Sequence, residues 1–193
     1  MADIADRQDV ALDGYLKLFK KAPQSAVLTD RLFETAIRKG DMPTAVKAAR
    51  AQELQDASAD LSPLLFFADA FRSRNWNMAD LAANELSQSG RFTFMAPVLQ
   101  AWVNVARGKP HGLKPVDAAQ SPFIAYYLSD QLAYLQFASS DIGDGRKTLE
   151  NLVKRDLEYS RDLMIRSAPV IAANGDNDFA DALQSVGIGA DWS

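Results

Sequence analysis

The chain has 193 residues, no cysteine, and 25 acidic against 21 basic side chains, which gives a net charge of -4 and a pI near 5.0. A chain of this length can bury a sizeable core without disulfides or metals, and the lack of cysteine excludes thiol catalysis, thiolate zinc sites and disulfide frameworks. The basic residues are scattered rather than gathered on one face, so no nucleic-acid partner is expected.

The most apolar stretch is FTFMAPVLQAWVNVA at 92–106. It is shorter than the roughly 20 apolar residues needed to cross a bilayer and contains polar side chains, so it predicts a buried helix and no membrane insertion. The opening MADIADRQD does not resemble a secretory signal, so any signal peptide is expected to be absent or already removed. The compartment stays open between periplasm and cytoplasm.

The first predicted helix, 10–22, has no helix before it with which to pair. Because a repeat helix cannot bury its apolar face alone, we expect this face to meet either an upstream segment missing from the chain or a second copy, as in a homodimer. The residues of this face are Val10, Leu12, Tyr15, Leu16 and Phe19.

Polar turns then recur along the chain at intervals close to 34 residues, each five residues before a position that is usually small or apolar. The pairs are Gly40 and Ala45, Arg74 and Ala79, Gly108 and Leu113, then, after a slip of one residue, Asp141 and Arg146, and last Gly175 and Ala180; the same register extends back to Asp6 and Ala11. Small residues let two antiparallel helices approach closely, and glycine ends a helix in a left-handed conformation without steric cost. The pattern predicts one helical hairpin per period.

Helix starts and interruptions follow the same frame. Ser62-Pro63 and Ser121-Pro122 place a capping hydroxyl before a proline at the first helical position. Pro110 and Pro115 predict that the second helix of the third hairpin is short or absent, and Pro169 predicts a kink or break. No segment alternates with the period of a strand, so the chain is predicted to be all-α.

The spacing from Ala11 to Tyr15, Leu18 and Pro23 resembles the second helix of a tetratricopeptide repeat, a 34-residue unit. The resemblance is degenerate elsewhere: Ala49 and Ala83 replace the aromatic residue, and Ala57 and Arg91 replace the proline. It implies an all-α, right-handed α-α superhelix (a TPR-like solenoid) of antiparallel helix pairs, with generic helical hairpins as the alternative. The chain would form one domain over 1–193, with the unpaired helix 10–22 and repeats at about 26–59, 60–93, 94–127, 127–160 and 161–187.

Motifs of catalysis or metal binding are weak. His111 has no histidine partner, and the acidic turns that begin at Asp141 and Asp176 hold Leu152 and Gly187 where a calcium loop needs glutamate. The late glycines VGIGAD lack the strand and third glycine of a dinucleotide site. We therefore expect no catalytic residue, metal or cofactor, and a protein that is not an enzyme.

The resemblance implies a concave groove lined by the first helix of each pair. Its candidate binding residues are Asp30, Glu34, Arg38, Leu64, Phe71, Arg72, Met95, Val98, Trp102 and Leu135, with Val27, Ile37, Leu61, Ala68, Val105, Ala106, Leu128 and Gln131 at the remaining groove positions. Trp102 fits either a groove anchor or a core residue, and Glu34 with Arg38 fits a surface ion pair. The family's clamp for acidic chain ends is not expected, because its positions hold Asp30, Glu34, Leu65, Met95 and Leu99.

The sequence thus favours a non-catalytic scaffold that binds a protein, as a peptide or a helix, in the groove, similar to loosely conforming bacterial repeat proteins. One alternative is homo-oligomeric assembly through the open ends of the array. Another is a helical enzyme or small-molecule-binding protein that uses Asp30, Glu34 and Arg38.

Overall fold

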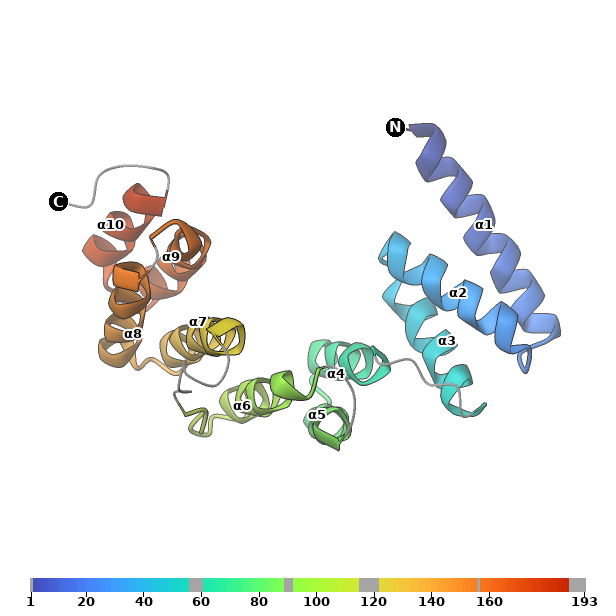
Figure 1. The fold of residues 1–193 in the computed structure, drawn as a ribbon, viewed down its shortest axis with the longest axis horizontal. Coiled ribbons are helices and arrows are strands. Elements are labelled where there is room, and N and C mark those ends of the chain that lie inside the picture. Colours follow the sequence, from blue (N-terminus) through green and yellow to red (C-terminus); the bar gives the residue numbers. More distant parts are fainter. Residues whose placement is uncertain (1, 56–60, 89–91, 115–121, 156, 188–193) are drawn as a thin grey trace. The chain divides into compact units, whose positions relative to one another are not determined.

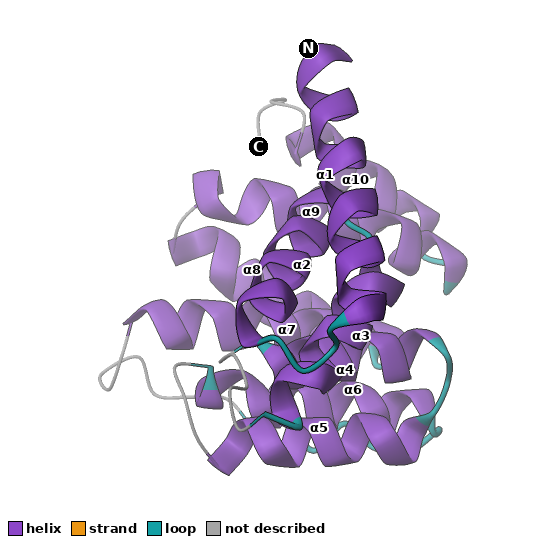
Figure 2. Ribbon diagram, turned by 90° about the vertical axis from the view of Figure 1, so that its right-hand side faces the viewer, coloured by secondary structure: helices purple, strands orange, loops and turns teal. Residues whose placement is uncertain are grey.

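A computed structural model describes residues 2–55, 61–88, 92–114, 122–155 and 157–187, all of which are helix, turn or irregular loop (Figures 1 and 2). The all-α prediction is therefore confirmed for this part of the chain. The chain divides into two compact units, Met1–Ala96 and Pro97–Ser193. Each unit is described by itself.

The first unit holds two helical hairpins behind an N-terminal helix. Its elements are α1 (Ala2–Lys21), α2 (Ala26–Lys39), α3 (Met42–Glu53), α4 (Ser62–Arg72), α5 (Trp76–Gln88) and the short 3-10 helix η1 (Thr93–Met95). Each α-helix packs on the next one along the chain, and η1 packs on α5. Leu32, Ala36 and Ala45, all fully buried, lie at the centre of a core that α1 to α4 share.

The second unit begins with a single helix and continues with two hairpins. Its elements are α6 (Ala96–Ala106), α7 (Pro122–Ala138), α8 (Ile142–Arg155), α9 (Leu157–Ala173) and α10 (Asn177–Gly187). The hairpins α7/α8 and α9/α10 share one core around Phe137, Met164 and Ile171. A separate cluster joins α6 to α7 through Val98, Leu128 and residues near them.

Among the described helices, five end with the same left-handed turn. The residues that hold the turn have positive φ: Gly40 (75°), Arg74 (57°), Gly108 (71°), Ser140 (60°) and Gly175 (93°). At each of them the N–H donates three residues back, and the next residue's N–H donates five residues back, as Asp41 does to the carbonyl of Ala36 at 2.9 Å. These two bonds satisfy carbonyls that a helix end leaves open. The predicted turn positions Gly40, Gly108 and Gly175 are confirmed.

The residue after the left-handed one begins the next helix in four of these turns. Asp41 accepts a hydrogen bond at Oδ1 from the N–H of Thr44 at 3.2 Å, and Asn75, Asp141 and Asp176 accept the same bond from Met78, Asp144 and Phe179. A side-chain cap of this kind stabilises a helix by about 1 kcal/mol. One dipeptide therefore ends the first helix of a hairpin and begins the second.

The fifth turn does not start a helix. Lys109 follows Gly108 where the other turns have Asp or Asn, and Pro110 comes next. Lysine offers no acceptor for a helix N-terminus, and the described residues 107–114 contain no helix. The predicted loss of the second helix after Gly108 is confirmed for these residues; Pro115 lies outside the described part.

A small residue stands four positions after each capping residue. Ala45, Ala79 and Ala180 are buried there, and in α8 the position belongs to Gly145 rather than to Arg146, as the sequence register had placed it. The turn lies one residue earlier than the register placed it, because Ser140 rather than Asp141 takes the left-handed position. A Cβ built on Gly145 would lie 2.6 Å from Cε1 of Phe137, so only glycine fits against this buried ring.

Helix boundaries differ from expectation in three places. The helix α1 begins at Ala2 rather than at residue 10, and Leu12 and Phe19 are buried against α2 and α3, so the chain itself covers much of the face expected to lack a partner. Leu61 rather than Ser62 is the N-cap residue of α4, with Pro63 one position later than predicted; Ser121 lies outside the described residues.

The third difference concerns Pro169, where a kink or break was expected but α9 continues to Ala173. Both Pro169 and Ile165 are exposed. Because the proline has no N–H for the carbonyl of Ile165, that carbonyl needs another donor, and on this face water can supply it.

Replacing Gly145 with alanine should destabilise the protein by about 1 to 3 kcal/mol, because the new methyl group overlaps the ring of Phe137. The matched control is Gly143→Ala, two residues earlier in α8 with open space around it, which should leave stability unchanged or raise it by up to about 1 kcal/mol. Urea unfolding followed by circular dichroism measures both. Equal effects of the two substitutions would contradict the close approach.

Arg74 and Ser140 hold a conformation that costs about 1 kcal/mol in residues with a Cβ. Arg74→Gly and Ser140→Gly should each raise the free energy of unfolding by up to about that amount, whereas Gly40→Ala should lower it by about the same. Thermal unfolding of the three variants checks the sign. A lower melting temperature for both glycine variants would refute the left-handed assignment.

Candidate functional site

The groove residues predicted on α2 lie on its exposed face. Asp30, Glu34 and Arg38 are all exposed, together with Val27 (71%) and Ile37 (39%). Arg38 lies 3.7 Å from Glu34, so the predicted surface ion pair is present. Asp30 accepts a hydrogen bond from Nε2 of Gln52 at 2.7 Å, which ties α2 to the end of α3.

The groove residues on α4 and η1 are less accessible. Phe71 is half-buried, with its ring stacked on Phe67 and edge-on to Trp76 at centroid distances of 5.4 and 5.2 Å. Leu64 and Met95 are also half-buried, whereas Arg72 is exposed, 4.0 Å from Asp69. The aromatic contacts make Phe71 a structural residue of the α4/α5 hairpin.

In the second unit, three predicted groove residues lie in the core. Val98 is 1% and Leu128 6% exposed, and Leu135 is fully buried, all in the cluster that joins α6 to α7. The register placed these residues on the open side of first helices, facing a groove. In the structure α6 packs its apolar side against α7 instead, and Leu113 joins the same cluster.

Trp102 packs against the same cluster and is half-buried. Its Nε1–H donates to Oε1 of Gln131 on α7 at 3.0 Å. Of the two readings that the sequence left open, these contacts favour a core residue. Gln131, another groove candidate, thus has its side chain engaged with Trp102.

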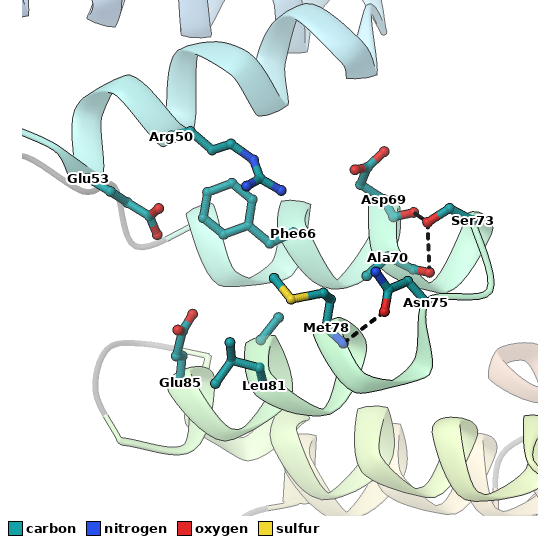
Figure 3. Close-up of a pocket in the computed structure, with 11 residues that line it drawn as sticks. Arg50, Glu53, Phe66, Asp69, Ala70, Ser73, Asn75, Met78, Leu81 and Glu85 are labelled. Atoms are coloured by element: carbon teal, nitrogen blue, oxygen red, sulfur yellow. Dashed lines mark hydrogen bonds between the residues drawn. The ribbon is translucent and has the colours of Figure 1, made fainter.

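A different surface of the first unit contains a hollow of about 240 Å³ between α3, α4 and α5 (Figure 3). Its lining residues are Arg50, Glu53, Phe66, Asp69, Ala70, Ser73, Asn75, Met78, Leu81, Ala82 and Glu85. None of them belongs to the predicted groove. On α4 and at its end, the lining residues are Phe66, Asp69, Ala70 and Ser73, which recur at helical spacing. They therefore share one face of the helix, which differs from the face that carries Leu64 and Phe71.

The hollow combines an apolar centre with charged ends. Phe66, Met78 and Leu81 form the centre, and the guanidinium of Arg50 lies 5.6 Å from the ring centroid of Phe66. Figure 3 shows Glu53 and Glu85 at one end and Asp69 at the other. Burial raises the pKa of Glu53 above its usual value, and the Glu85 carboxylate raises it further, whereas Arg50 acts in the opposite sense.

The sequence contained a signal for this hollow that the groove register passed over. Within WNMADLAANELSQ, Met78, Leu81 and Glu85 recur at helical spacing beside the alanines that face the core. Met78 is 40% and Leu81 49% exposed, so they form a second, outward stripe on α5.

The described residues also bear on metal binding and membrane insertion. No group of three or more His, Asp or Glu side chains among them could hold a metal ion. None of the described helices has the length and apolarity to span a membrane. His111 accepts a hydrogen bond at Nδ1 from the N–H of Leu113 at 3.0 Å, so the imidazole shapes the loop after α6.

The comparisons with known proteins find no match: no protein-family model fits the chain, and neither a curated protein nor a solved structure is similar enough to count as a relative.

Trp102→Ala should destabilise the protein by about 3 kcal/mol, because the indole packs in the α6/α7 cluster. Trp102→Phe keeps most of the apolar contact but loses the hydrogen bond to Gln131, so it should cost only about 1 kcal/mol. Urea unfolding measures both free energies. A loss below about 1 kcal/mol for Trp102→Ala would restore the groove reading.

Proposed function

We propose that the protein is a non-catalytic interaction scaffold, a TPR-like array of hairpins that binds a peptide or helix of a partner protein along the exposed faces of its first helices. The repeated turn carries this proposal. In four hairpins, a dipeptide of the same geometry ends the first helix and caps the second, and a small residue follows four positions after the cap. A repeat unit requires this kind of recurrence. Arrays of such units form extended surfaces and commonly serve to bind other proteins.

The face of α2 is the best-supported part of this surface. Val27, Asp30, Glu34, Ile37 and Arg38 follow one another at helical spacing and are all exposed. Two exposed apolar side chains among charges of both signs suit an amphipathic peptide, whose apolar residues would anchor it. The alternative of assembly through α1 has less support, because Leu12 and Phe19 are already buried within the chain.

Peptides that bind the full chain can be selected from a random display library. Ile37→Asp should lower their affinity by about tenfold, or about 1.4 kcal/mol, because a charge would replace an apolar contact. Ile165→Asp on α9 is the matched control, since Ile37 and Ile165 are 39% and 41% exposed. Isothermal titration calorimetry measures the affinities. Peptides that bind both variants as tightly as the native chain would refute recognition by α2.

A further inference from the structure

The hollow between α3, α4 and α5 presents apolar side chains that the fold leaves partly uncovered. Met78 and Leu81 on α5 are 40% and 49% exposed, and Phe66 on α4 is half-buried beside them. Figure 3 shows Met78 in the middle of the hollow, facing Phe66 across it. An apolar side chain of a partner that entered here would lose water contact on several sides at once.

The charges around this centre are unbalanced. Three carboxylates, of Glu53, Asp69 and Glu85, line the hollow against the single guanidinium of Arg50 among the described lining residues, which leaves two negative charges in excess. Asp69 has Arg72 at 4.0 Å. No described cation forms an ion pair with Glu53 or Glu85. Burial of Glu53 and the neighbouring carboxylate of Glu85 both raise the pKa of Glu53.

Arg50 already shows that the hollow accommodates a cation. Its guanidinium stacks over Phe66, a favourable contact between a positive charge and an aromatic face. The single charge of Arg50 does not neutralise both Glu53 and Glu85, which lie at the end of the hollow formed by α3 and α5 (Figure 3). A second cation placed between Glu53 and Glu85 would therefore gain two charge-assisted partners.

We propose that this hollow binds a basic amphipathic helix of a partner protein, with one apolar side chain seated on Phe66, Met78 and Leu81 and a neighbouring Lys or Arg held by Glu53 and Glu85. A volume of about 240 Å³ suits one inserted side chain, whereas small-molecule sites are about 300 to 1,000 Å³. The proposal adds a second recognition site, because it shares no residue with the exposed face of α2.

The probe is a fluorescent helical peptide about 15 residues long, with leucine at i, i+3, i+4 and i+7 on one face and lysine on its flanks. A sign-reversed peptide carries glutamate at every lysine position. Fluorescence anisotropy with the full chain should show the lysine peptide binding at least about tenfold more tightly. Equal binding of the two peptides would overturn the proposal.

Variants of the hollow then locate the binding. Glu53→Gln with Glu85→Gln should weaken the lysine peptide by at least about tenfold, and Leu81→Ala should weaken it by about fivefold. The control Asp178→Asn with Asp181→Asn removes the same charge from exposed positions on α10 and should change affinity less than about twofold. Circular dichroism confirms that each variant stays folded.

The remaining outcomes are decisive as well. Equal losses in the Gln and Asn double variants would mean general attraction to an acidic protein and would overturn the site. If Ile37→Asp weakened binding of the lysine peptide and the variants of the hollow did not, the proposal for the hollow would be overturned. The proposed binding surface on α2 would then remain. Displacement of the peptide by phenethylamine at an equal concentration would make the hollow a small-amine site instead.

Discussion

The structure depends on one local constraint, a dipeptide that ends one helix and begins the next. The first residue takes a left-handed conformation so that two backbone N–H groups return to the helix just completed, and the second caps the following helix with a side-chain oxygen. Gly40-Asp41 and Gly175-Asp176 are the clearest examples. Because the turn is so short, the two helices of a hairpin must lie against each other, and a small residue is needed where they approach.

This constraint explains which parts of the fold the sequence could predict. The turns were visible as Gly or a polar residue at intervals close to 34, and the buried alanines, such as Ala45 and Ala79, followed five residues later. The turn of the α7/α8 hairpin was placed one residue too late, at Asp141, because a serine occupies the left-handed position there. Sequence alone favours glycine at that position and gives no sign that Ser140 accepts the strain.

The candidate site was less predictable, because it depends on which side of a helix meets a neighbour. The register placed Val98 and Leu135 on a free surface, yet both are buried in the cluster between α6 and α7. The hollow on α5 arises from a stripe that lies beside the core alanines, and its negative charge comes from α3, α4 and α5 together. Such a combination follows from packing three helices and not from the period of any one of them.

The shared turn also bears on how the chain reaches this structure. Each hairpin closes over a short stretch of sequence, and most neighbouring helices are consecutive, so the contacts that must form have little loop-closure entropy against them. Folding can therefore nucleate in more than one hairpin and spread by docking the next. The division between Ala96 and Pro97 is then a natural kinetic boundary, on either side of which hairpins form without waiting for the other.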